Sequence, residues 1–396
     1  MSVITAKYRV VTPLFMAADP AGDAELRAAS LKGVLRFWYR ATALAAHGSW
    51  RDVQKMEAQV FGGVGSGQGQ ASFLLRLRTG NSVQVIKQRE KDNFSLAAYL
   101  GYGAVDAVKK QNIRSYIAPG ALFEADFRFK PGSGKDHLRA VKTACIALGL
   151  FGGLGARSRR GFGSVSLESL QVDGVEHWRC PRDPQALVEE ITKFLKNLGE
   201  TPVDLPEYSA FSRHSRVVVL GNTEEDPMKL LDAIALEMML YRSYGKKGKE
   251  DKHWVDGHEA RQLFADDHDL ILDFLSSGRI GRHPRRVAFG LPHNYYFSSE
   301  KSKVDVRPAG GQRVEKDGGR RASPLFIHIQ PVAEQYTAVL TLLASVFLPE
   351  DRKIAVETGK TPRKTSITVP VDQGVNTYGV IHDFLNLLSD GLEVRM

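Results

Sequence analysis

The sequence predicts an α+β protein with a ferredoxin-like βαββαβ unit in its first half. In the first half, the segments follow the order strand, helix, strands, helix and strand, which is the order that a ferredoxin-like unit requires. The second half carries a further strand, helix and strand pattern. The length of 396 residues also suits about two domains.

Hydrophobic periodicity locates the elements of the first domain, expected over residues 1–173. Ser30 is expected to be the N-cap of the first long helix, because a serine hydroxyl accepts a hydrogen bond from the free N–H groups of a helix start. The expected strands are residues 3–11, 73–78 and 121–129, and the expected helices are residues 31–46, 50–61, 96–109 and 137–150.

Residues 174–209 are rich in proline and charge and are expected to connect the two domains, the second of which spans residues 210–396. Asp226 followed by Pro227 predicts the start of a helix. Residues 244–255 and 298–321 hold Lys, Arg and Gly with few large apolar side chains, so we expect insertions that order only on binding. The other expected elements are strands at 216–220, 325–330 and 336–347 and a helix at 377–388.

The overall charge favours a polyanionic partner. Lys and Arg total 54 against 45 Asp and Glu, which gives 54 − 45 = +9. Cys145 and Cys180 do not form a CxxC pair, so we expect no metal, no cofactor and no disulfide framework, and the composition fits a reducing cytoplasm. No signal peptide is visible, and the longest apolar stretch, residues 336–348, is too short to cross a membrane.

Three basic residues recur every fourth position on the first long helix. Lys32, Arg36 and Arg40 therefore project from one side of it. Such a stripe is either a solvated face or a contact surface for an anion.

A glycine- and arginine-rich loop, residues 152–164, is the strongest functional signal. Glycines permit close approach of backbone N–H groups to a ligand, and with arginines they form a cradle for phosphates. Phe162 is an aromatic side chain of the kind that stacks on bases, and we expect the three arginines to be exposed. The loop residues expected to contact RNA are Gly153, Gly155, Arg157, Ser158, Arg159, Arg160, Gly161 and Phe162.

The order of an N-terminal strand, the sequence ELRAASLKGVLRFWYR at residues 25–40 and the sequence GGLGARSRRGFGSV at residues 152–165 resembles the RAMP superfamily of CRISPR proteins. The LKGVLRFW stretch, with RRASPLFI at residues 320–327, resembles the first-subunit family of the type III-B (Cmr) effector complex. The resemblance implies an α+β fold of two ferredoxin-like domains, each an RNA-recognition-type βαββαβ unit, packed as a pair and carrying insertions. It also implies an RNA-binding structural subunit that acts in antiviral defence. Its partners would be single-stranded guide RNA or target RNA near the guide 3′ end, together with other Cmr subunits.

The resemblance also implies that the loop and the basic helix, with Lys32, Arg36 and Arg40, contact RNA. Charge clustering adds Arg285, Arg286, Arg320 and Arg321 to the expected RNA-binding residues.

An alternative is a metal-independent endoribonuclease that processes guide RNA, which the same superfamily also includes. His47 would be its general acid or base. Against this, His47 directly precedes Gly48 and suits a helix C-terminus. Tyr39, Arg40 and His47 are also spaced so that we do not expect them to converge on one phosphate. We therefore expect a binding protein without catalytic residues.

Overall fold

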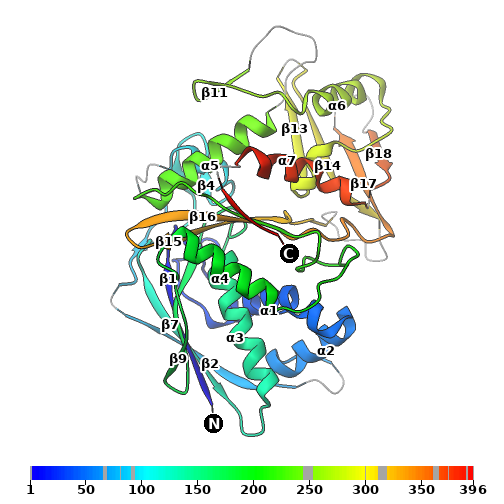
Figure 1. The fold of residues 1–396 in the computed structure, drawn as a ribbon. Coiled ribbons are helices and arrows are strands. Elements are labelled where there is room, and N and C mark those ends of the chain that lie inside the picture. The colour runs from blue at the N-terminus through cyan, green and yellow to red at the C-terminus, as the bar shows by residue number, and fades with distance from the viewer. Residues whose placement is uncertain are drawn as a thin grey trace.

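The computed structural model describes residues 2–65, 69–80, 82–90, 94–243, 253–298, 300–310, 319–359, 365–372, 374–388 and 391–395. It is a mixed α+β fold built from several small antiparallel sheets stacked with helices between them (Figure 1). No helix in these ranges is long and apolar enough to span a membrane.

The first sheet has five antiparallel strands, and Ala6 at its centre pairs with Ala125 on one side and Leu170 on the other. In β1 the odd-numbered positions are half-buried and the even-numbered positions are buried, which is the period of two that predicted a strand. In sheet order the strands are β2 (Phe73–Thr79), β7 (Leu122–Phe129), β1 (Val3–Val10), β8 (Val165–Val172) and β9 (Val175–Arg179).

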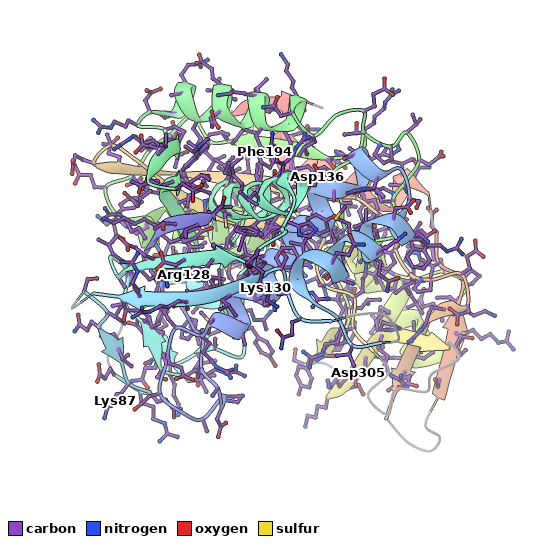
Figure 2. The ribbon with its side chains drawn as sticks, turned by 90° about the horizontal axis from the view of Figure 1, so that it is seen from below. Lys87, Arg128, Lys130, Asp136, Phe194 and Asp305 are labelled. Atoms are coloured by element: carbon purple, nitrogen blue, oxygen red, sulfur yellow. The ribbon has the colours of Figure 1, made fainter. Side chains whose placement is uncertain are left out.

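Four helices belong to this part of the chain: α1 (Ala28–His47), α2 (Trp50–Phe61), α3 (Lys135–Phe151) and α4 (Pro184–Lys196). The N-cap of α1 is Arg27 and not Ser30, because Ala28 and Ala29 already belong to the helix. The segment expected as a connection, 174–209, contains both β9 and α4. Phe194 of α4, labelled in Figure 2, is buried against Phe151 of α3, so this segment contributes to the core.

The second sheet separates two apolar cores, one on each of its faces. Its strands, in order, are β15 (Leu325–Val332), β16 (Gln335–Leu342), β10 (Arg216–Val219) and β19 (Leu392–Arg395). Phe326 of β15 packs against Phe37 and Trp38 of α1 at ring distances of 5.6 and 5.5 Å. Ile327, the next residue, faces the opposite core. The helices α1 and α3 are therefore enclosed between the first and second sheets (Figure 1).

Helices and a third sheet lie on the opposite side of the second sheet (Figure 1). The N-cap Asp226 accepts a hydrogen bond from the N–H of Met228, which confirms the predicted start of α5. The helices are α5 (Pro227–Arg242), α6 (Ala265–Ser277) and α7 (Gly379–Leu387), with 3-10 turns η2 (Arg285–Phe289) and η3 (Val375–Tyr378). The third sheet has the order β13 (His293–Phe297), β14 (Ser302–Gly310), β17 (Arg352–Thr358) and β18 (Thr365–Val369).

Several predicted elements are wrong. Instead of a helix over 96–109, the chain forms a single 3-10 turn, η1 (Leu96–Tyr99), because Gly101 packs tightly against Val105 and Gly103 takes a positive φ of 84°. The strand expected to reach residue 347 ends at Leu342. Of the predicted insertions, 244–252, 299 and 311–318 lie outside the described residues, whereas Ser302–Gly310 is the regular strand β14. The shortest strands pair as β3 (Val85–Ile86) with β6 (Tyr116–Ile117), β4 (Val105–Asp106) with β5 (Gln111–Asn112), and β11 (Trp254–Val255) with β12 (His258–Glu259).

Candidate nucleic-acid interface

The glycine-rich loop connects α3 to β8 and lies against the second sheet. Its backbone pairs with β15, where the N–H of Ile327 donates to the carbonyl of Arg159 at 3.2 Å. Thr12 donates its hydroxyl to the carbonyl of Gly161 at 2.6 Å. The loop is therefore fixed between the two halves of the chain.

The loop glycines permit dense packing, because an added Cβ at these positions would collide with neighbouring atoms. Gly155 has a φ of 77°, and a Cβ there would lie 2.4 Å from the carbonyl oxygen of Phe15. Gly161 has a φ of 84°, and its Cβ would lie 2.4 Å from a methyl group of Leu231. A Cβ at Gly153 would lie 2.7 Å from the carbonyl oxygen of Gly163. Glycine is therefore required at these three positions by packing within the protein itself, where any side chain would collide.

Two of the three loop arginines point into the protein, contrary to the expectation that all three are exposed. The guanidinium of Arg159 donates to the carbonyl oxygen of Ser323 at 2.6 Å and lies 4.5 Å from the ring centre of Phe326. The guanidinium of Arg160 donates to the carbonyl oxygen of Phe289 at 3.0 Å. Burial lowers the pKa of Arg159 to about 10 and that of Arg160 to about 9. Both side chains join the loop to the second half of the chain.

Phe162 is 0% exposed and packs between Phe15 and Phe94 at ring distances of 5.6 and 6.0 Å. The expectation that its ring stacks on a base is wrong for this conformation, because both faces of the ring are covered by protein.

Arg157 is the loop arginine that faces solvent, and the neighbouring Ser158 is half-buried. The Arg157 guanidinium lies 5.7 Å from the ring centre of Tyr102, a side chain that is 69% exposed. Burial lowers the pKa of Arg157, and the charges of Arg320 and Arg114 lower it further. Arg114, Arg157 and Arg320 thus form a cluster of neighbouring positive charges, and no ion pair joins any of them to a carboxylate within the described ranges.

A cavity of about 220 Å³ adjoins this arginine cluster. Gly155 and Ala156 of the loop, Arg114 and Ser30 contribute to its wall. Ser30 lies in the first turn of α1, which has neither an acidic residue in that turn nor a side-chain cap. The first N–H groups of a helix have no partner within the helix and carry a partial positive charge, which favours anions. The cavity therefore combines three features that favour a phosphate: a helix start, a guanidinium and a backbone loop.

The basic stripe of α1 is largely engaged within the protein. Arg36 and Arg40 both donate to the same carboxylate oxygen of Glu57 on α2, at 2.6 and 2.7 Å. Lys32 lies 5.8 Å from the ring centre of Phe73, and burial followed by the charges of Arg36 and Lys130 lowers its pKa. Lys130, labelled in Figure 2, follows the end of β7. The spacing of the stripe thus reflects the packing of α1 against α2.

The arginines added from charge clustering lie in different places. Arg320 is exposed and belongs to the arginine cluster, whereas the guanidinium of Arg321 donates to the hydroxyl of Ser345 at 2.7 Å. Arg285 donates to the carbonyl oxygen of Leu263, and Arg286 lines a separate cavity of the second half. The four therefore do not form one surface.

Two of the candidate catalytic residues of the endoribonuclease alternative, Tyr39 and His47, are in contact. The hydroxyl of Tyr39 lies 3.3 Å from Nε2 of His47, closer than their separation along the helix suggested. That Tyr39, Arg40 and His47 do not converge on one phosphate stays a prediction. Burial raises the pKa of the Tyr39 phenol well above its ordinary value, and Arg40 is held by Glu57. Within the described ranges, no group of three or more His, Cys, Asp or Glu side chains is arranged to hold a metal ion.

Sequence reasoning did not include Arg114, Tyr102 or the start of α1 in the candidate site. Arg114 is a lone basic residue and Tyr102 lies in a segment expected to be helical, so neither stood out in the sequence.

Comparison with known proteins finds similarity to the RAMP superfamily and to Cmr1 proteins. The model of the RAMP superfamily matches residues 7–166, which include α1 and the whole glycine-rich loop. The CRISPR system Cmr subunit Cmr1-1 of Pyrococcus furiosus is 29% identical over 335 residues, 83% of each chain. Cmr1-2 of the same organism is 26% identical over 179 residues, which are 41% of this chain and 92% of that protein. The crystal structure of P. furiosus Cmr1 in its apo form shares the fold, with a TM-score of 0.52 at 17% identity over 97% of both chains.

Proposed function

We propose that this chain belongs to the RAMP superfamily and is an RNA-binding structural subunit of a type III-B CRISPR ribonucleoprotein, the Cmr complex. Its partners would be other Cmr subunits and single-stranded guide or target RNA, contacted near the guide 3′ end. The similarity to Cmr1-1 over 83% of both chains supports this role, because it extends through both halves of the molecule.

The strand orders support two ferredoxin-like units as the fold of the two halves. If the strands of the first sheet other than β9 are numbered along the chain, the order β2-β7-β1-β8 reads 2-3-1-4, and α1 and α3 occupy the helix positions. The second sheet, β15-β16-β10-β19, has the same 2-3-1-4 order, with α5 and α7 in those positions. We infer that the third sheet is an insertion into the second unit, and that β9 extends the sheet of the first.

The arginine cluster is the observation that carries the proposed RNA surface. The charges of Arg114 and Arg320 lie near that of Arg157, and Arg114 lines a cavity together with Ser30 at the start of α1. Tyr102 supplies an exposed ring. Arginines and helix N-terminal amides bind backbone phosphates, which every RNA sequence shares. A protein that binds through such contacts has little sequence preference and an affinity that falls steeply with salt.

Within the glycine-rich loop, Arg157 and Ser158 are the residues that we propose to contact RNA directly. Arg159, Arg160 and Phe162 would act indirectly, by holding the loop in place. The same reasoning gives Arg36 and Arg40 a structural role and leaves Lys32 as a secondary contact. Such a loop resembles a rigid support that positions a small number of exposed groups.

We propose that the subunit does not cleave RNA. A metal-independent RNase needs a base, an acid and a cation around one phosphate. Here Arg40 is bound to Glu57, and the buried phenol of Tyr39 is strongly disfavoured from ionising. Reproducible cleavage of guide-repeat RNA that His47→Ala abolishes would favour the endoribonuclease instead.

The test of RNA binding is fluorescence anisotropy of a labelled single-stranded RNA with the full chain over a range of salt concentrations. The triple variant Arg114→Ala, Arg157→Ala and Arg320→Ala should bind more weakly. Its log–log salt dependence should be shallower by about 2, since each phosphate contact on a single strand contributes about 0.7. The matched control is Arg51→Ala, Arg139→Ala and Arg182→Ala, which removes three exposed arginines elsewhere. Equal losses in the two triple variants would contradict the proposed surface.

A further inference from the structure

The cavity of about 220 Å³ beside the arginine cluster has an apolar wall that the proposed phosphate contacts do not explain. Its volume is below the range of about 300 to 1,000 Å³ that is usual for pockets of drug-sized ligands. A phosphate is bound by charges and hydrogen-bond donors and has no use for apolar neighbours. The cavity therefore suits a small and largely apolar group that is attached to a phosphate. The apolar lining residues are Phe15, Met16, Ala17, Pro20 and Ala156.

The walls of this cavity come from segments that are distant in sequence, and hydrogen bonds join them to one another. The N–H of Ala156 donates to the carbonyl oxygen of Phe15 at 2.8 Å. The hydroxyl of Ser115 donates to the carbonyl oxygen of Gly22, also at 2.8 Å. Phe15 is 4% exposed, and its ring packs against that of Tyr116 at 5.4 Å. The fold thus forms the cavity before a ligand binds, which lowers the entropy cost of binding.

Two hydroxyl groups in the wall can form hydrogen bonds with a ligand. The hydroxyl of Ser30 has no hydrogen-bond partner within the described ranges. The hydroxyl of Ser115 donates to Gly22, so its oxygen can still accept. A hydroxyl both donates and accepts, and it can therefore pair with the polar edge of any of the four bases. Such a wall holds a base without selecting its identity.

The position of the cavity connects it to the proposed phosphate contacts. Arg114 lines the cavity, and its positive charge lies near that of Arg157. Gly155 and Ala156, which also line the cavity, directly precede Arg157 in the glycine-rich loop. A phosphate held by these two arginines is therefore next to the cavity. Unstacked bases of single-stranded RNA turn away from the backbone and insert into such protein surfaces.

We propose that this cavity receives one base of the single-stranded RNA, whose neighbouring phosphate is held by Arg114 and Arg157. The inference rests on the proposed function, because it requires the RNA backbone at the arginine cluster. It adds that the surface needs a base at one position of the strand without selecting which base. Tyr102 is not a lining residue of the cavity and would contact a different base.

Competition anisotropy with the full chain tests the proposal with two oligomers of the same length, a short oligouridylate and a ribose-phosphate chain that carries no bases. The parent should prefer the oligouridylate. Ala17→Leu fills part of the cavity and should reduce this preference by about tenfold, because the base loses its apolar contacts. Its affinity for the base-free oligomer should not change. The matched control is Ala18→Leu, which alters the neighbouring exposed residue outside the cavity.

Two further measurements keep the test valid if Ala17→Leu lowers the melting temperature. Ala156→Leu fills the cavity from the glycine-rich loop and should act in the same direction as Ala17→Leu. In the parent protein, RNA that carries 4-thiouridine should crosslink to the lining residues when irradiated, and mass spectrometry of the peptides identifies the sites. Crosslinks confined to residues outside the cavity would contradict the proposal.

The outcomes separate the base site from RNA binding as a whole. A chain that binds neither oligomer contradicts the proposed RNA binding and the base site with it. Equal affinity of the parent for both oligomers leaves RNA binding intact and overturns the base site alone. The base site is also overturned if Tyr102→Ala removes the whole preference while Ala17→Leu retains it. Competition by UMP as strong as that by oligouridylate would identify a free nucleotide as the ligand and overturn the assignment to RNA.

Discussion

Arg159 donates a hydrogen bond to the carbonyl oxygen of Ser323 at 2.6 Å, across 164 residues of sequence. The same guanidinium packs on the ring of Phe326. A residue that the sequence suggested for RNA binding thus joins the first and second halves of the chain.

The first prediction is that Arg159→Met destabilises the protein without directly weakening RNA binding. The substitution leaves the Ser323 carbonyl without its donor, which costs about 1 to 3 kcal/mol. Thermal melts should show a lower melting temperature, and RNA affinity measured well below it should match the parent. Arg157→Met is the control, because the exposed Arg157 should give the reverse pattern. If Arg159→Met instead weakened RNA binding and left the melting temperature unchanged, Arg159 would be an RNA-contacting residue and the prediction would be wrong.

The second prediction concerns Glu57, whose side chain is 5% exposed and accepts from both Arg36 and Arg40. Glu57→Gln leaves two guanidinium groups without their counter-charge. Because the arginines are partly exposed and screened by solvent, we expect a loss of about 1 to 3 kcal/mol in the free energy of unfolding. Glu176→Gln breaks the exposed pair with Arg179 and should change stability by about 0.5 kcal/mol or less. Denaturant titration measures both, and equal effects would refute a structural role for Glu57.

The third prediction compares two aromatic side chains near the glycine-rich loop. Phe162→Ala should cost about 3 to 5 kcal/mol of stability, because it opens a cavity in the core. Tyr102→Ala should leave stability nearly unchanged and weaken RNA binding by about 1 to 3 kcal/mol if its exposed ring stacks on a base. Chemical denaturation and RNA anisotropy on the same samples distinguish the two. An unaltered RNA affinity for Tyr102→Ala would remove this ring from the proposed surface.

The fourth prediction is a pH dependence that originates in the first sheet. Hydrogen bonds from Arg78 to the buried carboxylate of Asp126 lower its pKa. The unfolded chain therefore takes up a proton at a higher pH than the folded protein does. The contribution of this ionised carboxylate to the free energy of unfolding is fully present above the ordinary Asp pKa of about 3.9. It is lost as the pH falls below that value toward the lower pKa of the folded protein. Melts between about pH 6 and pH 3 should show a smaller loss for Asp126→Asn than for the parent. The exposed Asp204→Asn should follow the parent, and a parallel decline of all three would contradict the assignment.

Local patterns predicted the elements whose own periodicity is strong. β1, α2, α3 and the start of α5 follow from alternation, from helical spacing and from the Asp226 cap, because each signal is contained within one segment. β14 was missed although Val304 and Val306 alternate with charged residues, because Gly, Lys and Arg around it suggested a mobile insertion.

The candidate site was harder to predict, because burial depends on contacts that are distant in sequence. Arg159 and Arg160 are inward because Ser323 and Phe289 supply carbonyl acceptors, 164 and 129 residues away. Nothing in the local sequence distinguishes them from Arg157, which faces solvent. Arg114 and Arg320 are neighbours of Arg157 only in the folded chain. Motif composition singled out the glycine-rich loop, and the three-dimensional structure decides which of its side chains are exposed to solvent.

The contact between the glycine-rich loop and β15 has a consequence for the order of synthesis. Residues 152–164 leave the ribosome well before Ser323 and Phe326 are made. During that interval, the partners that hold the loop in place do not yet exist, so its arginines and the apolar face next to it meet water. Nascent chains with such surfaces are prone to aggregation. The first half of this protein is therefore expected to need the second for solubility, and expression of residues 1–173 alone should yield insoluble material.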